Sequence, residues 1–294
     1  MWIPVTVVAA GFQTARTALQ HRLRALLSVS GAGFVRYLYG APLSTLAVLV
    51  AWRTGVAWPH IAGRFWPVIA AGGVAQILGT VCLIHAFDAR DFAIGTMFSK
   101  TEVVQVALFS AVLLGETLPP AGWLGVVVCT VGVVALATKG KRLTWALVRQ
   151  PAAGWGLAAG GLLGLAAVCI RAATKAMTDS PAVMRALVTL AVMNTIQTIV
   201  HGGYLVLRER PQIRLAVVHW RSSAVVGLLS VCGSAGWAIA LSLEQAAKVR
   251  TLGQVEVLFT FAVSRWWLRE RHAAVEYAAS ALVLAGVLLV LLGG

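Results

Sequence analysis

The sequence predicts an all-α integral membrane protein with ten transmembrane helices, arranged as two inverted five-helix repeats. Of its 294 residues, 59% are hydrophobic and 12% are charged, whereas about a quarter of the residues in a soluble domain are charged. Apolar runs of about 20 residues, each long enough to cross roughly 30 Å of hydrocarbon, recur from end to end. The two halves of the chain also resemble each other, which favours a repeat architecture.

Hydropathy and helix-breaking residues divide the chain into ten predicted spans. In chain order these spans are 2–15, 33–52, 65–86, 92–114, 120–138, 154–173, 182–206, 222–241, 249–268 and 273–292. The first span is the shortest, and we expect it to stay in the protein because neither a basic region nor a small-residue cleavage site accompanies it. Pro119 and Pro120 separate the fourth span from the fifth, and "RERPQIR" separates the seventh from the eighth. Tryptophans gather near the predicted span ends, as in an interfacial aromatic belt.

The internal repeat appears when the sequence is shifted by 154 positions. Residues 66–134 then align with residues 220–288 without a gap, and Glu102 falls on Glu256. Chance similarity between apolar helices predicts matches among Leu, Val and Ala, but not a pair of glutamates in mid-span. The alignment therefore indicates a duplicated unit.

The repeat sets the expected domain boundaries. We divide the chain into a first five-helix repeat, 1–138, a polar inter-repeat loop, 139–153, and a second five-helix repeat, 154–294. Because five is an odd number of crossings, the second repeat enters the membrane from the opposite side. This inverted arrangement is the one on which many secondary transporters are built.

Several other classes of protein are excluded by composition and motifs. The net charge of +14 comes from basic residues in short gaps between apolar runs, which is typical of topology signals and headgroup contacts and not of a nucleic-acid surface. The four cysteines lie inside apolar spans without a CxxC pattern, which favours packing over a disulfide or zinc framework. The sequence contains no P-loop, GxSxG or HExxH motif. The glycines of "GWGLAAGGLLG" have the four-residue spacing of close helix packing. We therefore expect no metal, no cofactor and no direct use of ATP.

Lys100 and Glu102 stand near the middle of the fourth span, where a charge is most expensive. An ionisable residue at the bilayer centre costs roughly 2.5 to 3.5 kcal/mol and usually faces a bundle interior or a water-filled cavity. Residues two apart point about 200° apart on a helix, so these two side chains need separate partners. In the second repeat Glu256 takes the place of Glu102, and Gln254 takes the place of Lys100. A cavity that binds substrate or a coupling ion is one interpretation, and a buried structural network is the other.

Further polar residues at membrane depth complete the candidate set. Gln105 shares a face with Glu102, and Gln76 and His85 lie in the third span. Such amides and histidines are more often helix glue than ligands, as we also expect for Asn194 and Gln197. Arg36, at the start of the second span, is either an interface anchor or an anion contact at a cavity mouth.

A known family shares these features. The segment "AVLLGETLPPAGWLGVVVCTVGVVAL" at 111–136, repeated more loosely at 264–291, resembles the EamA-like members of the drug/metabolite transporter superfamily. The second copy departs from the pattern, with Arg269 where Gly115 stands, so Glu270 is the weaker match. The resemblance implies ten helices in two repeats and a secondary carrier that moves small organic metabolites or drugs, often outward, through a central cavity between the repeats.

The predicted function is therefore a secondary transporter, an exporter by resemblance, in the cytoplasmic membrane. Its partners are a small-molecule substrate and the lipid bilayer, without nucleic acid, and the sequence leaves the oligomeric state open, a monomer included. The alternatives are a scaffold without transport activity and a membrane-embedded enzyme, for which His85, Asp88 and Asp91 form the one polar cluster.

The charge distribution and the family resemblance predict opposite orientations in the membrane. The loops after odd-numbered spans hold 14 Lys and Arg residues and those after even-numbered spans hold 4. The positive-inside rule then places both termini outside the cytoplasm, whereas the resemblance implies termini inside it.

Overall fold

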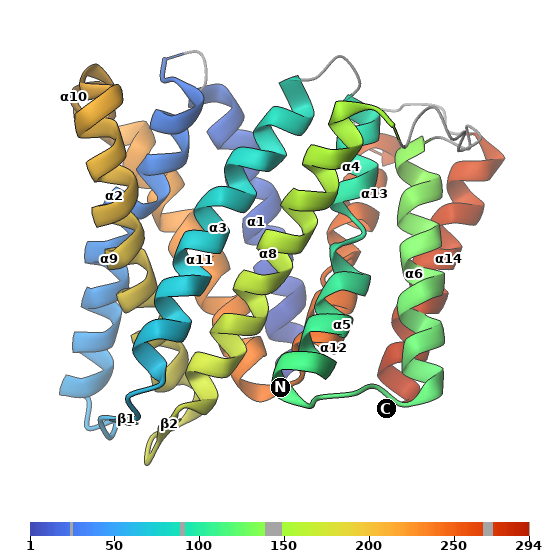
Figure 1. The fold of residues 1–294 in the computed structure, drawn as a ribbon, viewed down its shortest axis with the longest axis horizontal. Helices are drawn as coiled ribbons and strands as arrows, with labels where there is room; N and C mark the ends of the chain where they lie inside the picture. Colours follow the sequence, from blue (N-terminus) through green and yellow to red (C-terminus); the bar gives the residue numbers. More distant parts are fainter. Residues whose placement is uncertain (24–25, 89–91, 139–148, 267–272, 294) are drawn as a thin grey trace. The chain divides into compact units, whose positions relative to one another are not determined.

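A computed structural model describes residues 1–23, 26–88, 92–138, 149–266 and 273–293, and most of them lie in α-helices (Figure 1). The helices of the first half are α1 (Trp2–Leu23), α2 (Val29–Arg53), α3 (Phe65–Asp88), α4 (Phe92–Ser99), α5 (Glu102–Leu114) and α6 (Pro120–Thr138). Those of the second half are α8 (Pro151–Lys175), α9 (Ala182–Arg208), α10 (Arg210–Val218), α11 (Trp220–Leu243), α12 (Ala246–Leu252), α13 (Val255–Trp266) and α14 (Ala274–Leu292). Two short strands, β1 (His60–Ile61) and β2 (Met177–Thr178), pair antiparallel.

The chain is a helical, multi-pass membrane protein. Among the described residues, 8 helices are long and apolar enough to cross a membrane. They are Ser30–Arg53, Phe65–Ala86, Met97–Leu114, Pro120–Thr138, Pro151–Lys175, Ala182–Arg208, Trp220–Leu243 and Ala274–Leu292. Two of the ten predicted spans are missing from this set. Helix α1 mixes polar and basic residues such as Gln13 and Arg16 into its apolar sequence. The described part of the predicted span 249–268 contains three charged residues, Arg250, Glu256 and Arg265, and the last two residues of that span lie outside the described part.

Two predicted helices are broken, which the sequence analysis did not foresee. The predicted span 92–114 consists of α4 and α5, separated by Lys100 and Thr101, and the predicted span 249–268 contains α12 and α13, separated by Gly253 and Gln254. At both breaks the backbone tightens to bonds between residues three apart. The Thr101 N–H donates to the Phe98 carbonyl at 3.2 Å, and the Gln254 N–H donates to the Thr251 carbonyl at 3.1 Å. The 154-position shift places Lys100 on Gln254, so the breaks occupy equivalent places in the two halves.

The described structure forms two compact units, each of which contains segments from both halves of the chain. Unit one comprises residues 1–77 and 169–244, and unit two comprises residues 78–168 and 245–294. Helices α3 and α8 contribute to both units. The repeat boundaries expected from the sequence remain a prediction, and most of the inter-repeat loop, 139–148, lies outside the described residues.

In unit one, α2 packs against α9 in antiparallel fashion. A Cβ atom on Gly33 would lie 3.5 Å from His201, and one on Gly40 would lie 3.3 Å from Asn194. The residue numbers therefore increase along α2 in the direction in which they decrease along α9. Helix α10, in a segment expected to be a loop, packs beside them. Its Ala216 is buried in a core cluster with Val35 and other residues of α2 and α11.

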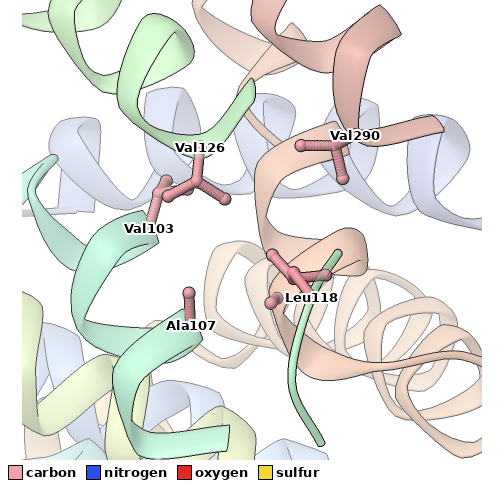
Figure 2. Packing of buried hydrophobic residues seen from close by; sticks show 6 residues of the cluster. Val103, Ala107, Leu118, Val126 and Val290 are labelled. Carbon is pink, nitrogen blue, oxygen red and sulfur yellow. The ribbon is translucent and has the colours of Figure 1, made fainter. Parts of the chain in front are cut away.

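In unit two, α6 and α14 lie side by side and antiparallel (Figure 1). A Cβ atom on Gly125 would meet Gly286 and Val290, and one on Gly132 would meet Val283 and Ala279. Small residues allow this close approach of two membrane helices. Beside the pair, Figure 2 shows the cluster that joins α5 to α6 and α14, formed by Val103, Ala107, Leu118, Val126, Ala247 and Val290.

The antiparallel pairs have a common relation to the repeat. Helix α2 corresponds to the second predicted span of the first half and α9 to the second predicted span of the second half. Helices α6 and α14 correspond to the fifth predicted spans of the two halves. Equivalent helices therefore pack against each other in opposite directions within both units.

Candidate functional site

The break between α4 and α5 is positioned by the backbone of α8. Gly156 faces Gly95 and Phe98 of α4, whereas Gly160 and Gly164 face the break and the start of α5. A Cβ atom on Gly160 would lie 2.8 Å from the Ser99 carbonyl oxygen, and one on Gly164 would lie 2.9 Å from Val106. The glycine stripe therefore allows α8 to approach the break directly, and the prediction that these glycines serve close helix packing is confirmed.

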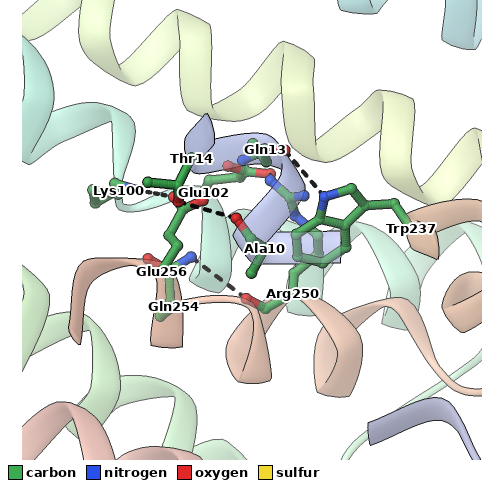
Figure 3. Close-up of polar contacts among 9 residues, drawn as sticks. All are labelled: Ala10, Gln13, Thr14, Lys100, Glu102, Trp237, Arg250, Gln254 and Glu256. Carbon is green, nitrogen blue, oxygen red and sulfur yellow. Dashed lines mark hydrogen bonds and ion pairs between the residues drawn. The ribbon is translucent and has the colours of Figure 1, made fainter. Parts of the chain in front are cut away.

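Two ion pairs join the breaks of the two halves (Figure 3). Lys100 Nζ lies 2.5 Å from Glu256 Oε1, and Arg250 donates to Glu102. Each pair takes its acid from one half of the chain and its base from the other. The order is crossed, because the earlier residue of the first half pairs with the later residue of the second half. This is the order that antiparallel packing of the two broken helices produces.

The partners explain how the membrane tolerates these charges. The Glu102 and Arg250 side chains are 9% and 16% exposed, and those of Lys100 and Glu256 are 22% and 19% exposed. Two acids face two bases, so the four charges sum to zero. As the 200° separation predicted, Lys100 and Glu102 have separate partners. A buried pair of this kind costs far less than an isolated charge at the same depth.

The helix ends at the breaks favour the same charges. Glu102 begins α5 and Glu256 lies in the first turn of α13, so both carboxylates sit at helix N-termini. Arg250 lies in the last turn of α12, at a C-terminus. The helix dipole stabilises acids at the first of these ends and bases at the second. Breaking the spans therefore creates stabilising positions for charge at membrane depth.

Gln254 adds an unsatisfied acceptor beside the ion pairs. Its Nε2 donates to the Arg250 carbonyl at 3.4 Å (Figure 3). Its Oε1 is buried and has no hydrogen-bond partner among the described residues. Most buried polar atoms in proteins are paired, so this oxygen is an exception at the break.

Two other predicted residues of unit two have local partners. Gln105 donates to Thr101 Oγ1 at 2.9 Å and to the Leu157 carbonyl at 3.4 Å, which ties the start of α5 to α8. His85 is exposed and lies against Trp155, with ring centroids 5.1 Å apart. Four of the eight predicted residues therefore lie at the ion pairs. Lys100, Glu102 and Glu256 are members of them, and Gln254 is bonded to Arg250.

Gln76 and Arg36 belong to unit one. Gln76 accepts from Gln197 at 2.7 Å, a contact between α3 and α9 that fits the expected helix glue. Asn194 donates to Ser44 at 3.3 Å in the same manner. The Arg36 guanidinium lies over the Tyr37 ring at 5.5 Å from its centroid.

Arg250 was missed by the sequence analysis. Arg250 is a charge near the start of the predicted span 249–268, which could have drawn attention to it. The equivalent position of the first repeat holds no basic residue, so the repeat did not point to it.

The enzyme alternative rested on His85, Asp88 and Asp91. Asp91 lies outside the described residues, and the described residues contain no group of three metal-ligating side chains.

Discontinuous helices in corresponding positions of two halves also occur in secondary transporters. The fold is that of a polytopic helical membrane protein. The chain belongs to the EamA-like transporter family, whose sequence model matches residues 1–138 and 151–292.

Comparison with individual proteins agrees with this assignment. An "Uncharacterized transporter in cobO 3'region" from a Sinorhizobium species is 34% identical over 98 residues, which are 32% of this chain and 68% of that protein. A solved structure described as "Crystal structure of protein" matches with a TM-score of 0.73 and 16% identity, over 99% of this chain and 96% of that one. The latter likeness shows the fold alone.

Proposed function

We propose that this protein is a secondary transporter that exports small organic metabolites or drugs across the cytoplasmic membrane by alternating access. Its central cavity lies between the two repeats, and the helix breaks of unit two form part of it. The observation that carries the proposal is the pair of equivalent breaks bridged by crossed ion pairs.

Ten crossings in two inverted repeats belong to the same proposal. In it, α1 and the α12–α13 segment also cross the membrane, in addition to the apolar helices described above. Support comes from the antiparallel packing of α2 with α9 and of α6 with α14. A pseudo-twofold axis in the membrane plane relates inverted repeats and makes equivalent helices antiparallel where they meet.

The ion pairs supply the chemistry that a carrier needs. A substrate ammonium group competes with Arg250 for Glu102, or with Lys100 for Glu256, and an anionic group competes for the bases. A proton on either carboxylate has the same effect, because it removes the charge that holds the base. Breaking a pair leaves a buried charge uncompensated, so binding at these residues is linked to a change in the arrangement of the broken helices.

The test is transport by purified protein in proteoliposomes, measured as counterflow against a panel of metabolites and across a range of pH. Glu102→Gln keeps the shape of the side chain and removes its charge. If Glu102 couples transport to protons, the variant inserts and folds but its transport loses its pH dependence. If Glu102 is the partner of a cationic substrate, the same change weakens binding over the whole range.

Glu256→Gln is expected to show a related but unequal effect, because Gln254 stands where the first repeat has Lys100. Asp179→Asn, in the exposed turn after β2, is the control and should transport as the native protein does. A double variant with both glutamates replaced that transports at the native rate and with native pH dependence would show that these carboxylates are structural.

A further inference from the structure

We propose that unit one carries a binding site for a single anionic phospholipid in a groove between α2 and α11. The groove has a volume of about 490 Å³ and is lined by Leu43, Trp220, Arg221, Ala224, Val225 and Leu228. The groove is shallow and open, since Trp220, Val225 and Leu228 are 55%, 48% and 51% exposed. The inference concerns a different surface from the helix breaks and does not depend on the transported substrate.

The shape of the groove fits an acyl chain. Trp220 and Arg221 form the first turn of α11, and the apolar lining continues through Ala224 and Val225 to Leu228. At 1.5 Å per residue this run extends about 12 Å along the helix. A lipid tail that enters beside Trp220 therefore follows apolar side chains into the hydrocarbon layer. Trp220 is exposed, as expected of a tryptophan at the interface.

Arg221 is the basic residue of the groove lining. The guanidinium of Arg221 lies 5.7 Å from the centroid of the Trp220 ring, so the cation is held at the entrance. Arg208 ends α9 and two further arginines, Arg210 and Arg214, stand on α10, and all of them are exposed. Basic side chains at the membrane surface attract anionic headgroups at roughly 1 kcal/mol each.

The acid in this segment is engaged in holding α10 in place. Glu209 accepts a hydrogen bond from the Ser28 hydroxyl at 2.6 Å, and Gln212 accepts from the Ser28 N–H at 2.8 Å. These bonds join the start of α10 to the start of α2. Helix α10 thus turns Ala216 toward the core and leaves Arg210 and Arg214 exposed, which is the pattern of an amphipathic helix at the interface. The positive charge in the groove lining is that of Arg221, and a phosphodiester headgroup complements it.

The proposal is tested by native mass spectrometry of the purified protein with phosphatidylglycerol and phosphatidylcholine of identical acyl chains. The native protein should retain one phosphatidylglycerol in preference to phosphatidylcholine. Arg221→Gln should weaken that binding about fivefold, the effect of one basic contact. Arg221→Lys, which keeps the charge, should retain most of it. Arg53→Gln, at the other end of α2, is the matched control and should bind as the native protein does.

A second variant tests the groove without changing charge. Ala224→Phe fills the apolar channel and should also reduce phosphatidylglycerol binding, whereas inorganic phosphate should not displace the bound lipid. Equal retention of the two lipids by the native protein would overturn the proposal, and that measurement needs no variant. Equal losses from Arg221→Gln and Arg53→Gln would overturn it as well, since they indicate general attraction to the basic surface.

Discussion

Replacing Arg250 by glutamine should destabilise the protein strongly. Arg250 is the partner of Glu102, whose side chain is 9% exposed, and the variant leaves that carboxylate buried without its base. Removing one member of a buried ion pair costs about 3 to 5 kcal/mol. Lys100→Gln breaks the more exposed pair with Glu256 and should cost about 1 to 3 kcal/mol, between the values for exposed and buried pairs.

Equilibrium unfolding of the purified protein in mixed detergent and SDS micelles measures these free energies. The variants Arg250→Gln, Glu102→Gln and the double variant form a double-mutant cycle. Because the double variant leaves no uncompensated charge, its loss of stability should be smaller than the two single losses added together, by about 0.5 to 3 kcal/mol. The pair of Lys100→Gln with Arg250→Gln, which do not contact the same acid, is the control. Additive losses for Glu102 and Arg250 would refute the pairing.

Three further outcomes are expected. Gly286→Ala should destabilise the protein by about 1 to 3 kcal/mol, because the added Cβ meets the backbone of Cys129. Gly154→Ala, which has open space around it, is the control and should not change the stability measured by thermal unfolding. Gly115→Ala should cost about 1 to 2 kcal/mol in the same assay, since the residue has a φ of 65°, and an unchanged stability would contradict this. A C-terminal fluorescent protein that folds only in the cytoplasm should stay dark if the Lys and Arg count sets the orientation, and bright cells would support the family arrangement.

Helix α6 shows how far local sequence signals reach. Its observed bounds, Pro120–Thr138, equal the predicted ones, because two prolines fix its start and an apolar run of membrane length follows.

Helix α10 was not predicted, because its packing is not encoded locally. Pro211 within "RERPQIR" indicated a break, but proline is also favoured in the first turn of a helix. Its packing against α2 depends on residues distant in the sequence, and no local pattern contains them.

The candidate site was predicted in part for the same reason. Two charges in mid-span indicated Lys100 and Glu102, and the repeat added Glu256. The break at Lys100 contains neither glycine nor proline, so hydropathy alone predicts a continuous helix through it. Arg250 is the partner that only the fold brings to Glu102, since 148 residues separate them in the chain. Periodicity finds buried charges, but three-dimensional structure is needed to find what neutralises them.

The crossed ion pairs have a consequence for how such a chain arises by duplication. Two identical copies of the first half, packed in the same antiparallel way, would place Lys100 of each copy opposite Glu102 of the other, and both acids would be neutralised. In the present chain the second lysine position holds Gln254, and the cation stands four residues earlier, at Arg250, one helical turn away. The two halves thus differ in where the second cation stands, and the four charges at the breaks still sum to zero. A gain or loss of charge in one half is tolerated when the other half compensates within one turn, so substitutions at these positions should be coupled between the halves.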